Sequence, residues 1–385
     1  MTRRLLLLVG GAALVLSAAG AGSARRAAGA RSAWTIRNLG TLPAPYSRNS
    51  EADQINNRGQ IRGWSGGAGV RMRGVVWRGG RRTILGGSSF VQTTAINARG
   101  DVIGSGSVTH DARNHLFLRR HDGTHLDLTS RYGLRGEVTD LNDRGEVVGQ
   151  MQVVRSTMHA FLFDGRHVTD LGTLGGANSS AAAINNAGQV VGASETAAGN
   201  SHAFVWQRGK MSDLGTLRGE SSAANSINAR GDIVGYAYVG YNDADHVLLW
   251  RDGRMVTVTG LGPGGLFPRE MTDHGAILVN TVNPARAYLW RAGKVTDLGS
   301  LGGGATFGYD VNEKGQVVGS SKVAPIHRAA FFWSRGKMTK LPALAPGGGP
   351  PYTTAFGIND RGYIVGASYV GRIGRERAVL WTFRR

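Results

Sequence analysis

The sequence predicts an all-β fold, an eight-bladed β-propeller built from four-stranded repeats of about 43 residues. Three observations support this prediction: one unit occurs eight times, each unit holds four strand-length apolar stretches, and the two chain ends hold complementary parts of one unit. The chain has 385 residues, of which 41% are hydrophobic, so it can bury a core. Its 60 glycines, about twice the usual share, indicate many tight turns.

The repeat is clearest in the motif Ile-Asn-x-x-Gly-x-Val-Val-Gly, which residues 184–192 match in full. Its central glycine recurs at intervals of 40 to 47 residues, at Gly59, Gly100, Gly145, Gly188, Gly231, Gly275, Gly315 and Gly362. An asparagine precedes it by three positions in every copy except the sixth, which has Thr272. Because an Asn side chain can bond the backbone two residues on, and Gly tolerates a positive φ, the motif predicts a tight β-hairpin.

Each unit divides into four short apolar stretches bounded by turn residues. In the fourth copy these are residues 181–184, 189–192, 202–206 and 210–214. No segment of helical length has a sustained 3.6-residue period. Four strands in about 43 residues are typical of one propeller blade.

The chain ends predict how the ring closes. Residues 34–42 resemble a fourth strand without the three that precede it, whereas the last copy ends after Trp381 without a fourth strand. We therefore expect the N-terminal strand to complete the last blade, within a single propeller domain over residues 34–385. An open solenoid would require polar caps instead.

The first residues are typical of a signal peptide. Arg3 and Arg4 precede an apolar segment, and Ala19-Gly20-Ala21 forms a cleavage site, which predicts a signal peptide over 1–21, cleavage after Ala21 and a short linker over 22–33. We expect an extracellular or periplasmic protein without a transmembrane segment, because no later apolar run reaches the length of a span. The chain contains no cysteine, which excludes disulfides and thiol nucleophiles.

Further motifs resemble a known bacterial group. His-Ala-Phe occurs at 159–161 and 202–204, and Asp-Leu-Gly-Thr-Leu at 170–174 and 213–217, beside the Ile-Asn-x-x-Gly motif. In these features the chain is similar to the HAF-repeat bacterial extracellular proteins over nearly all of residues 34–381. The resemblance implies an exported repeat protein and carries no reaction, ligand or catalytic residue. Arg286 and Arg377 replace the histidine in later copies, so the tripeptide is not an obligatory chemical group.

The residue that begins the third stretch is the main candidate binding position. It is His or Arg in seven of eight copies: Arg73, His115, His159, His202, His246, Arg286 and Arg377. One hypothesis is a cationic ring that binds an anionic ligand such as an acidic glycan or phosphate. The alternative is that each side chain hydrogen-bonds within its own or a neighbouring blade, since repetition in every unit favours a structural role. An aspartate of the fourth stretch (Asp127, Asp170, Asp213 or Asp297) is the expected partner.

Other candidates lie where copies differ. The second copy adds His110, His121 and His125, whose spacing lacks a third fixed metal ligand, so we expect no metal site and no cofactor. Unrepeated loops at 236–246 and 342–352 are expected on a rim of the propeller. The recurrent tryptophans, such as Trp250, are expected to pack between blades; if exposed, they would instead suit sugar stacking.

The formal net charge is +19 and falls to +17 when the signal peptide is removed. The bases are 39 Arg and six Lys, spread along the repeats instead of gathered in one run. This dispersion and the predicted export argue against nucleic acid as a partner and favour weak, salt-sensitive attraction to acidic surface polymers.

Two functions follow from these features. The first is a secreted, non-catalytic and monomeric binding or scaffold propeller for an anionic glycan, a cell-surface polymer or a protein. The second is a polysaccharide hydrolase or lyase of propeller fold. The second requires unrepeated Asp or Glu residues that converge at one end of the channel, whereas the absence of catalytic motifs favours the first.

Overall fold

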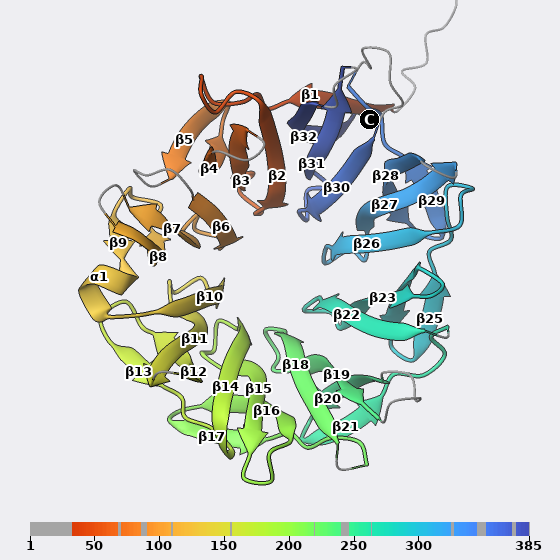
Figure 1. Cartoon of the computed structure of the whole chain (residues 1–385). Helices are drawn as coiled ribbons and strands as arrows, with labels where there is room; N and C mark the ends of the chain where they lie inside the picture. The colour runs from red at the N-terminus through yellow and green to blue at the C-terminus, as the bar shows by residue number, and fades with distance from the viewer. Residues whose placement is uncertain are drawn as a thin grey trace, which may run out of the picture.

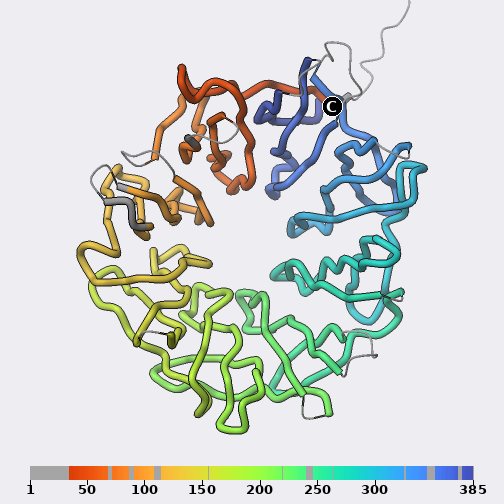
Figure 2. The backbone as a smooth tube through the Cα atoms, viewed as in Figure 1, coloured from red at the N-terminus to blue at the C-terminus, as the bar shows by residue number. Residues whose placement is uncertain are grey.

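The computed structural model describes residues 33–384 apart from 68–70, 86–90, 109–110, 155, 219, 240–245, 263, 325–326, 345–351 and 372–374. Eight four-stranded antiparallel sheets stand around a central axis, which confirms the predicted eight-bladed propeller (Figure 1). The backbone tube follows this ring from the first blade to the last (Figure 2). The predicted signal peptide, its Ala21 cleavage site and nearly all of the linker lie outside the described residues.

The first four blades each use four consecutive strands, from the innermost strand outward. Blade 1 is β2 (Asn49–Ile55), β3 (Ile61–Gly67), β4 (Arg71–Arg78) and β5 (Arg81–Leu85). Blade 2 is β6 (Val91–Ile96), β7 (Val102–Val108), β8 (Asp111–Arg119) and β9 (His125–Asp127). Blade 3 is β10 (Gly136–Leu141), β11 (Val147–Val154), β12 (Thr157–Phe163) and β13 (Val168–Asp170). Blade 4 is β14 (Gly175–Ile184), β15 (Val190–Thr196), β16 (Ser201–Gln207) and β17 (Lys210–Asp213).

The next three blades repeat this order, and the eighth combines both ends of the chain. Blade 5 is β18 (Ser221–Ile227), β19 (Ile233–Tyr238), β20 (His246–Arg251) and β21 (Arg254–Thr257). Blade 6 is β22 (Gly265–Met271), β23 (Ala276–Val282), β24 (Arg286–Arg291) and β25 (Lys294–Asp297). Blade 7 is β26 (Thr306–Val311), β27 (Val317–Ala324), β28 (His327–Ser334) and β29 (Lys337–Lys340). Blade 8 is β30 (Thr353–Ile358), β31 (Ile364–Val370), β32 (Arg375–Arg384) and β1 (Ala33–Asn38).

The predicted ring closure is confirmed. Strand β1 pairs antiparallel with β32, so that Trp34 lies opposite Phe383 and Ile36 opposite Trp381. The Thr35 and Thr382 hydroxyls add a side-chain hydrogen bond of 2.8 Å across the same pair. The N-terminal strand is therefore the outer strand of the last blade, as Figure 1 shows beside the C-terminus.

The hydrophobic core consists of clusters between neighbouring blades. One cluster joins Val318 of blade 7 to Ile358 and Trp381 of blade 8, and a comparable cluster lies at each of the other seven interfaces. Most of the recurrent tryptophans are buried there, which confirms the packing hypothesis. The indole of Trp250 also donates to the Leu214 carbonyl at 2.8 Å, between blades 5 and 4.

The turn asparagines form a second connection around the ring. Within its own turn, the Asn56 side-chain oxygen accepts the Arg58 and Gln60 amide protons, as the motif predicted. Its side-chain amide also donates to the backbone carbonyl of Asn97 in the next blade, at 2.8 Å. The equivalent bonds continue from blade to blade and cross the closure from Asn359 to Asn56 at 3.0 Å.

Blade 6 interrupts this asparagine ring. Thr272 stands in place of the asparagine, and its hydroxyl accepts the Ala276 amide proton but carries no amide donor for blade 7. Asn280 connects the two blades instead, since its side chain donates to the Gly308 carbonyl at 2.8 Å and accepts the Gly308 amide proton at 2.9 Å.

Each innermost strand contains a β-bulge two residues before its last hydrophobic residue. In blade 4 the pairing skips Ala182 between Ala181 and Ala183. In this blade the strands approach so closely that only glycine fits opposite the bulge, because a Cβ on Gly192 would lie 2.0 Å from the Ser180 carbonyl oxygen. A bulge turns its extra residue out of the regular pairing, so it determines which side chains leave the sheet.

One helical turn departs from the predicted all-strand pattern. Helix α1 (Leu128–Tyr132) follows β9, with Asp127 as its N-cap and Gly133 at its C-terminal end. It is five residues long. Among the described residues there is no helix with the length and apolar character needed to cross a membrane.

The interrupted asparagine ring gives a stability prediction. Thr272→Asn should supply the missing amide donor to the Asn312 carbonyl and raise the free energy of unfolding by about 1 kcal/mol. Urea denaturation of the two proteins measures the change.

A substitution that removes an asparagine from the ring provides the control. Asn359→Ala removes the bond across the closure and the acceptor of its own turn, and should lower the free energy of unfolding by about 1–3 kcal/mol. A Thr272→Asn protein no more stable than the wild type would contradict the role given to the asparagine ring.

Candidate functional site

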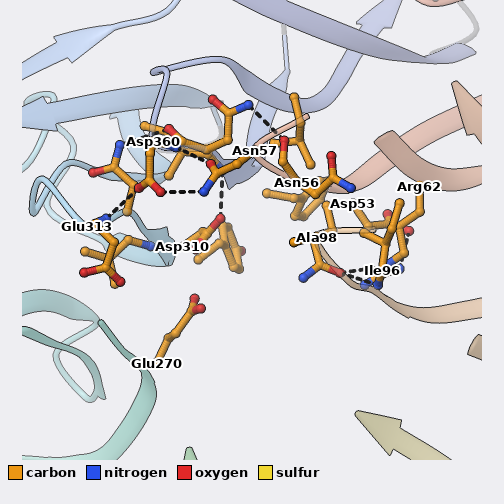
Figure 3. Close-up of a pocket in the computed structure, with 18 of the residues that line it drawn as sticks. Asp53, Asn56, Asn57, Arg62, Ile96, Ala98, Glu270, Asp310, Glu313 and Asp360 are labelled. Carbon is orange, nitrogen blue, oxygen red and sulfur yellow. Dashed lines mark hydrogen bonds and ion pairs between the residues drawn. The ribbon is translucent and has the colours of Figure 1, made fainter. Parts of the chain in front are cut away.

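The candidate site is a pocket at the end of the central channel where the Asn-x-x-Gly turns lie. This mouth pocket has a volume of about 430 Å³. Residues of blades 1, 2, 6, 7 and 8 line it, including Asp53, Arg269, Glu270, Tyr309 and Asp310. Figure 3 shows Glu270 and Asp310 on one side of the pocket, and Asp53 and Arg62 on another.

The bulges supply the most variable part of the lining. Asp53, Arg269, Tyr309 and Phe356 are the bulge residues of blades 1, 6, 7 and 8, and all four line the mouth pocket. The bulge residues of blades 2 to 5 are smaller and uncharged: Thr94, Thr139, Ala182 and Asn225. The repeated scaffold thus carries chemically distinct residues on one part of the channel wall.

The residue after each bulge explains the position of Glu270. In blades 3 and 7 this residue is Asp140 or Asp310, whose carboxylate accepts an amide proton of the next blade at 3.0 and 2.7 Å. Glu270 occupies the same position in blade 6, but the Val311 amide proton of blade 7 goes to Asp310 at 2.7 Å. The Glu270 carboxyl therefore extends into the channel, where it hydrogen-bonds the Asp310 carboxyl.

Glu270 and Asp310 behave as a pair that shares a proton. Glu270 is exposed to the water of the channel, but the protein around its carboxyl displaces part of the bulk solvent and raises the pKa of Glu270 above its usual range. The negative charges of Asp310 and Asp140 add to this rise. Burial also raises the pKa of Asp310, which its hydrogen bonds from Glu270 and from the Ile358 and Val311 amides oppose. Glu270 is therefore the protonated member and Asp310 the acceptor.

A second carboxyl lies across the pocket beside a fixed cation. Burial raises the pKa of Asp53 to about 8, and the neighbouring Arg62 opposes this rise. The Arg62 guanidinium lies 3.1 Å from Asp53 and also donates to Gln54 and to the Thr93 carbonyl, each at 3.0 Å. These bonds hold one donor group at a defined place in the pocket lining.

Asp53 is also connected to the closure of the ring. Hydrogen bonds link Asp53 to Glu51, Glu51 to Glu376, and Glu376 to Tyr369, so the chain of groups passes from blade 1 to blade 8. Burial raises the pKa of Glu51 and of Glu376. The mouth pocket thus opens onto a hydrogen-bonded row of carboxyl groups at the interface of the first and last blades.

Two aromatic rings complete the pocket. Tyr309 and Phe356 come from blades 7 and 8 and lie with ring centroids 5.4 Å apart. Both are half-buried, so part of each ring is open to the channel. Carboxyl, guanidinium and amide groups beside open aromatic faces can bind a molecule that has both hydroxyl groups and apolar C–H faces.

The structure places the predicted His/Arg positions at equivalent points of their blades. His159, His202 and Arg286, for example, all lie near the start of the third strand, opposite Met151, Ser194 and Thr281. Because the Asn-x-x-Gly turns adjoin the other end of that strand, these positions are remote from the mouth pocket. His246 begins β20 at the corresponding position, opposite Ala237.

These His and Arg side chains hydrogen-bond other residues of the protein, as the hypothesis of a structural role predicts. His115, His159, His202 and Arg286 contact Asp127, Asp170, Asp213 and Asp297 of the fourth strand at 2.8, 2.9, 2.8 and 2.7 Å. Arg73 donates to the Tyr46 hydroxyl at 2.9 Å, and Arg377 to the Arg48 carbonyl at 2.7 Å. Ligand binding by this ring remains a prediction.

The unusual histidines of blade 2 do not converge. His121 contacts Asp101 at 2.7 Å, His125 stacks on Phe117, and His110 lies outside the described residues. The described part of the chain holds no group of three or more acidic or histidine residues arranged to bind a metal ion.

Ser130, His115 and Asp127 lie together beside α1 but do not form a catalytic triad. The serine hydroxyl donates to Asp127 at 2.8 Å and lies 3.3 Å from Nδ1 of His115, the same nitrogen that contacts Asp127. A nucleophilic serine requires the other ring nitrogen.

The sequence analysis did not find the mouth pocket. The signal was present, since aligning the copies on the turn asparagine places Asp53, Arg269, Tyr309 and Phe356 in one column. Of the loops that it did select, 236–246 lies outside the described residues from 240 to 245, and 342–352 from 345 to 351.

Comparisons with known proteins identify the fold and no family. No protein-family model and no curated protein matches the sequence. Two solved structures of an acylaminoacyl peptidase from Pyrococcus horikoshii are similar, with TM-scores of 0.51 and 0.50 and identities of 10% and 9%; each match covers 84% of this chain and 58% or 59% of the peptidase. A puromycin-hydrolyzing peptidase of Mycobacterium tuberculosis is 15% identical over 89% of this chain and 54% of its own, with a TM-score of 0.46. This chain thus spans less than two thirds of the peptidases, and the likeness to the Pyrococcus structures shows a common fold.

The Glu270–Asp310 pair predicts a pH dependence of stability. A carboxyl whose pKa rises on folding binds more protons in the folded than in the unfolded protein, so stability falls as the pH rises from about 4.5 through the raised pKa. Glu270→Gln should therefore lose less stability than the wild type between pH 5 and pH 8, because its side-chain amide does not titrate. Urea denaturation at both pH values measures this difference.

Glu195→Gln is the matched control. Hydrogen bonds from Asn178 and from the Ala177 amide lower the pKa of Glu195, so its contribution is already complete above about pH 5. The control should be less stable than the wild type by the same amount at pH 5 and pH 8. A parallel loss of stability in Glu270→Gln and the wild type would contradict the shared proton.

Proposed function

We propose that this protein is an exported saccharide-binding propeller of the HAF-repeat type, and that the mouth pocket is its binding site. The leader-like N-terminus and the repeated His-Ala-Phe and Asp-Leu-Gly-Thr-Leu motifs support the export and the family. The propeller fold supports a binding role, because a channel mouth built from several blades presents side chains from distant parts of the chain to one ligand.

The choice of the mouth pocket as the binding site rests on one observation. The eight copies repeat their turn and packing residues, yet the channel positions of blades 1, 6, 7 and 8 hold an acid, a base and two aromatic rings. Selection for stability alone gives no reason for these differences at positions that face a cavity. Unrepeated polar residues around a cavity are the expected mark of a binding site.

The chemistry of the lining favours a saccharide. Sugar hydroxyls both donate and accept, and the pocket offers Arg62 and Arg269 as donors and Asp310 as an acceptor. The raised pKa of Glu270 favours its protonated form, which is a further donor. Tyr309 and Phe356 offer aromatic faces to the C–H side of a sugar ring.

A glycan screen with matched variants tests this proposal. The purified protein should bind a neutral or acidic oligosaccharide, and Tyr309→Ala should weaken the binding at least about tenfold in calorimetry, because it removes one of the two aromatic faces. His202→Ala, at the equivalent position of the His/Arg ring, serves as control and should bind as the wild type does.

Two outcomes would overturn the assignment. Binding that survives Tyr309→Ala but is lost in a protein with His159, His202 and Arg286 all changed to Ala would move the site to the His/Arg ring. A protein that retains the wild-type thermal unfolding curve and binds no saccharide in the screen would contradict the function itself.

A polysaccharide hydrolase is the second candidate, because unrepeated carboxyl groups converge at one end of the channel. The raised pKa of Glu270 is the property that a general acid requires. Glycosidases place their second carboxyl about 5–9.5 Å from the acid, whereas Asp310 is in hydrogen-bond contact with Glu270. The second carboxylate would therefore be Asp140 of blade 3, whose negative charge acts on Glu270, because the pKa of Asp53 is raised to about 8.

Reducing-end assays on polysaccharides that the protein binds decide between the two candidates. For the hydrolase, Glu270→Gln should lower kcat by at least about 100-fold while the saccharide still binds, because the variant cannot deliver a proton. For the binding module, neither protein should release reducing ends above the rate of a blank without protein.

A further inference from the structure

All eight blades present the turn between their first and second strands on one face of the propeller, and blades 1 to 7 also present the turn between their third and fourth strands there. Consecutive strands of each sheet are antiparallel, so the turn between strands one and two and the turn between strands three and four leave the blade at the same end. Contacts between the two turns show this directly: Arg251, at the third-to-fourth turn of blade 5, donates to Asp232 of the first turn at 2.8 Å. We call this side of the propeller the turn face, and the mouth pocket opens on it.

An inner ring of cations surrounds the mouth pocket on the turn face. The third residue of the Asn-x-x-Gly turn is a base in six of the eight copies, and all six are exposed: Arg58, Arg99, Arg144, Arg230, Lys314 and Arg361. The asparagine ring sets these turns side by side from blade to blade. Residues dispersed in the sequence are therefore gathered in space.

An outer set of cations lies farther from the axis on the same face. The turns between the third and fourth strands carry exposed bases in several blades, among them Arg78, Arg81, Arg208, Lys210, Arg254, Arg291, Lys294, Arg335 and Lys337. The predicted scattering of charge along the chain thus becomes two concentric sets on one surface. This arrangement was not foreseen from the sequence.

The acids of the inner turns do little to neutralise these cations directly. Asp143, Asp273, Glu313 and Asp360 each accept a backbone amide proton from the preceding blade, at 2.8, 2.7, 2.8 and 3.0 Å. Within the described part of the chain, the ion pairs of the inner ring are those of Arg144 with Glu146 and Arg230 with Asp232. The guanidinium groups of Arg58, Arg99 and Arg361 are open to an external anion.

We infer that the turn face binds an acidic polysaccharide, an extended polymer that carries carboxylate groups on its sugar units. Arginine donates in a planar fork that fits a carboxylate, and a ring of such forks suits a chain with repeated anions. The acids among the inner turns disfavour a partner with the charge density of nucleic acid, whereas sugar hydroxyls can donate to them. The inference goes beyond the proposed function and rests on residues outside the mouth pocket.

Binding of alginate, a polymer of uronic acids, tests the inference with two triple variants of equal charge. Arg58→Ala, Arg99→Ala and Arg361→Ala change the turn face, and copy four already has Ala187 at the equivalent position, so the fold should tolerate them. Arg48→Ala, Arg135→Ala and Arg375→Ala change exposed arginines near the starts of strands β2, β10 and β32, at the other end of the blades. Thermal unfolding of both variants confirms that each is folded.

The expected result is salt-sensitive binding of alginate by the wild type at low ionic strength. The turn-face triple should bind at least about tenfold more weakly and with a shallower salt dependence, and the control triple should bind within about twofold of the wild type. Equal weakening in both triples would overturn the inference, because net charge alone would then account for binding. Equal affinity for double-stranded DNA, or no binding of alginate at low salt, would also overturn it.

Discussion

The closure between blade 8 and blade 1 is the constraint on which the rest of the molecule depends. Each blade is a sheet covered on both faces by its neighbours, and the core is divided among the interfaces between blades. A blade at an open end would leave one apolar face in water. The pairing of β1 with β32 and the bond from Asn359 to Asn56 hold the last interface together, so they protect all the others from opening.

The same constraint decides where the chain is free to vary. Residues packed between blades repeat because each interface presents the same geometry, whereas the bulge residues of the channel meet a cavity. Blade 6 departs furthest: Thr272 replaces the turn asparagine, and Val279 replaces the strand-two glycine and faces Pro268. Asn280 restores the connection to blade 7 at the interface where Glu270 meets Asp310. Blade 6, which departs furthest from the repeated sequence, is thus also the blade that contributes Glu270 to the carboxyl pair of the mouth pocket.

The fold was predictable from the sequence because its determinants are local and repeated eight times. The turn asparagine, the turn glycine and the displaced last strand each specify an element whose partner follows from symmetry. The mouth pocket was harder to predict, because it forms between blades that are distant in sequence and depends on bulges that shift a side chain by one position. Arg269 and Tyr309 look like ordinary strand residues until the ring brings them to one wall. The cations of the turn face were missed for the same reason. Their regular spacing is visible in the sequence, but the sequence does not show that they lie on one face of the propeller.

A strongly basic protein with carboxyl groups at the centre of its basic face presents no contradiction, because the two sets of charges act at different distances. The carboxyls of the mouth pocket share protons or accept hydrogen bonds from backbone amides and arginine, so their influence ends within the cavity. The arginines of the turns extend into solvent, where their field reaches about a Debye length, roughly 8–10 Å at ordinary salt. Attraction of an anionic polymer to the face and selection of a group inside the pocket are therefore separable steps. A polymer of sugars can satisfy both, since it carries the anions on its length and the hydroxyls on each unit.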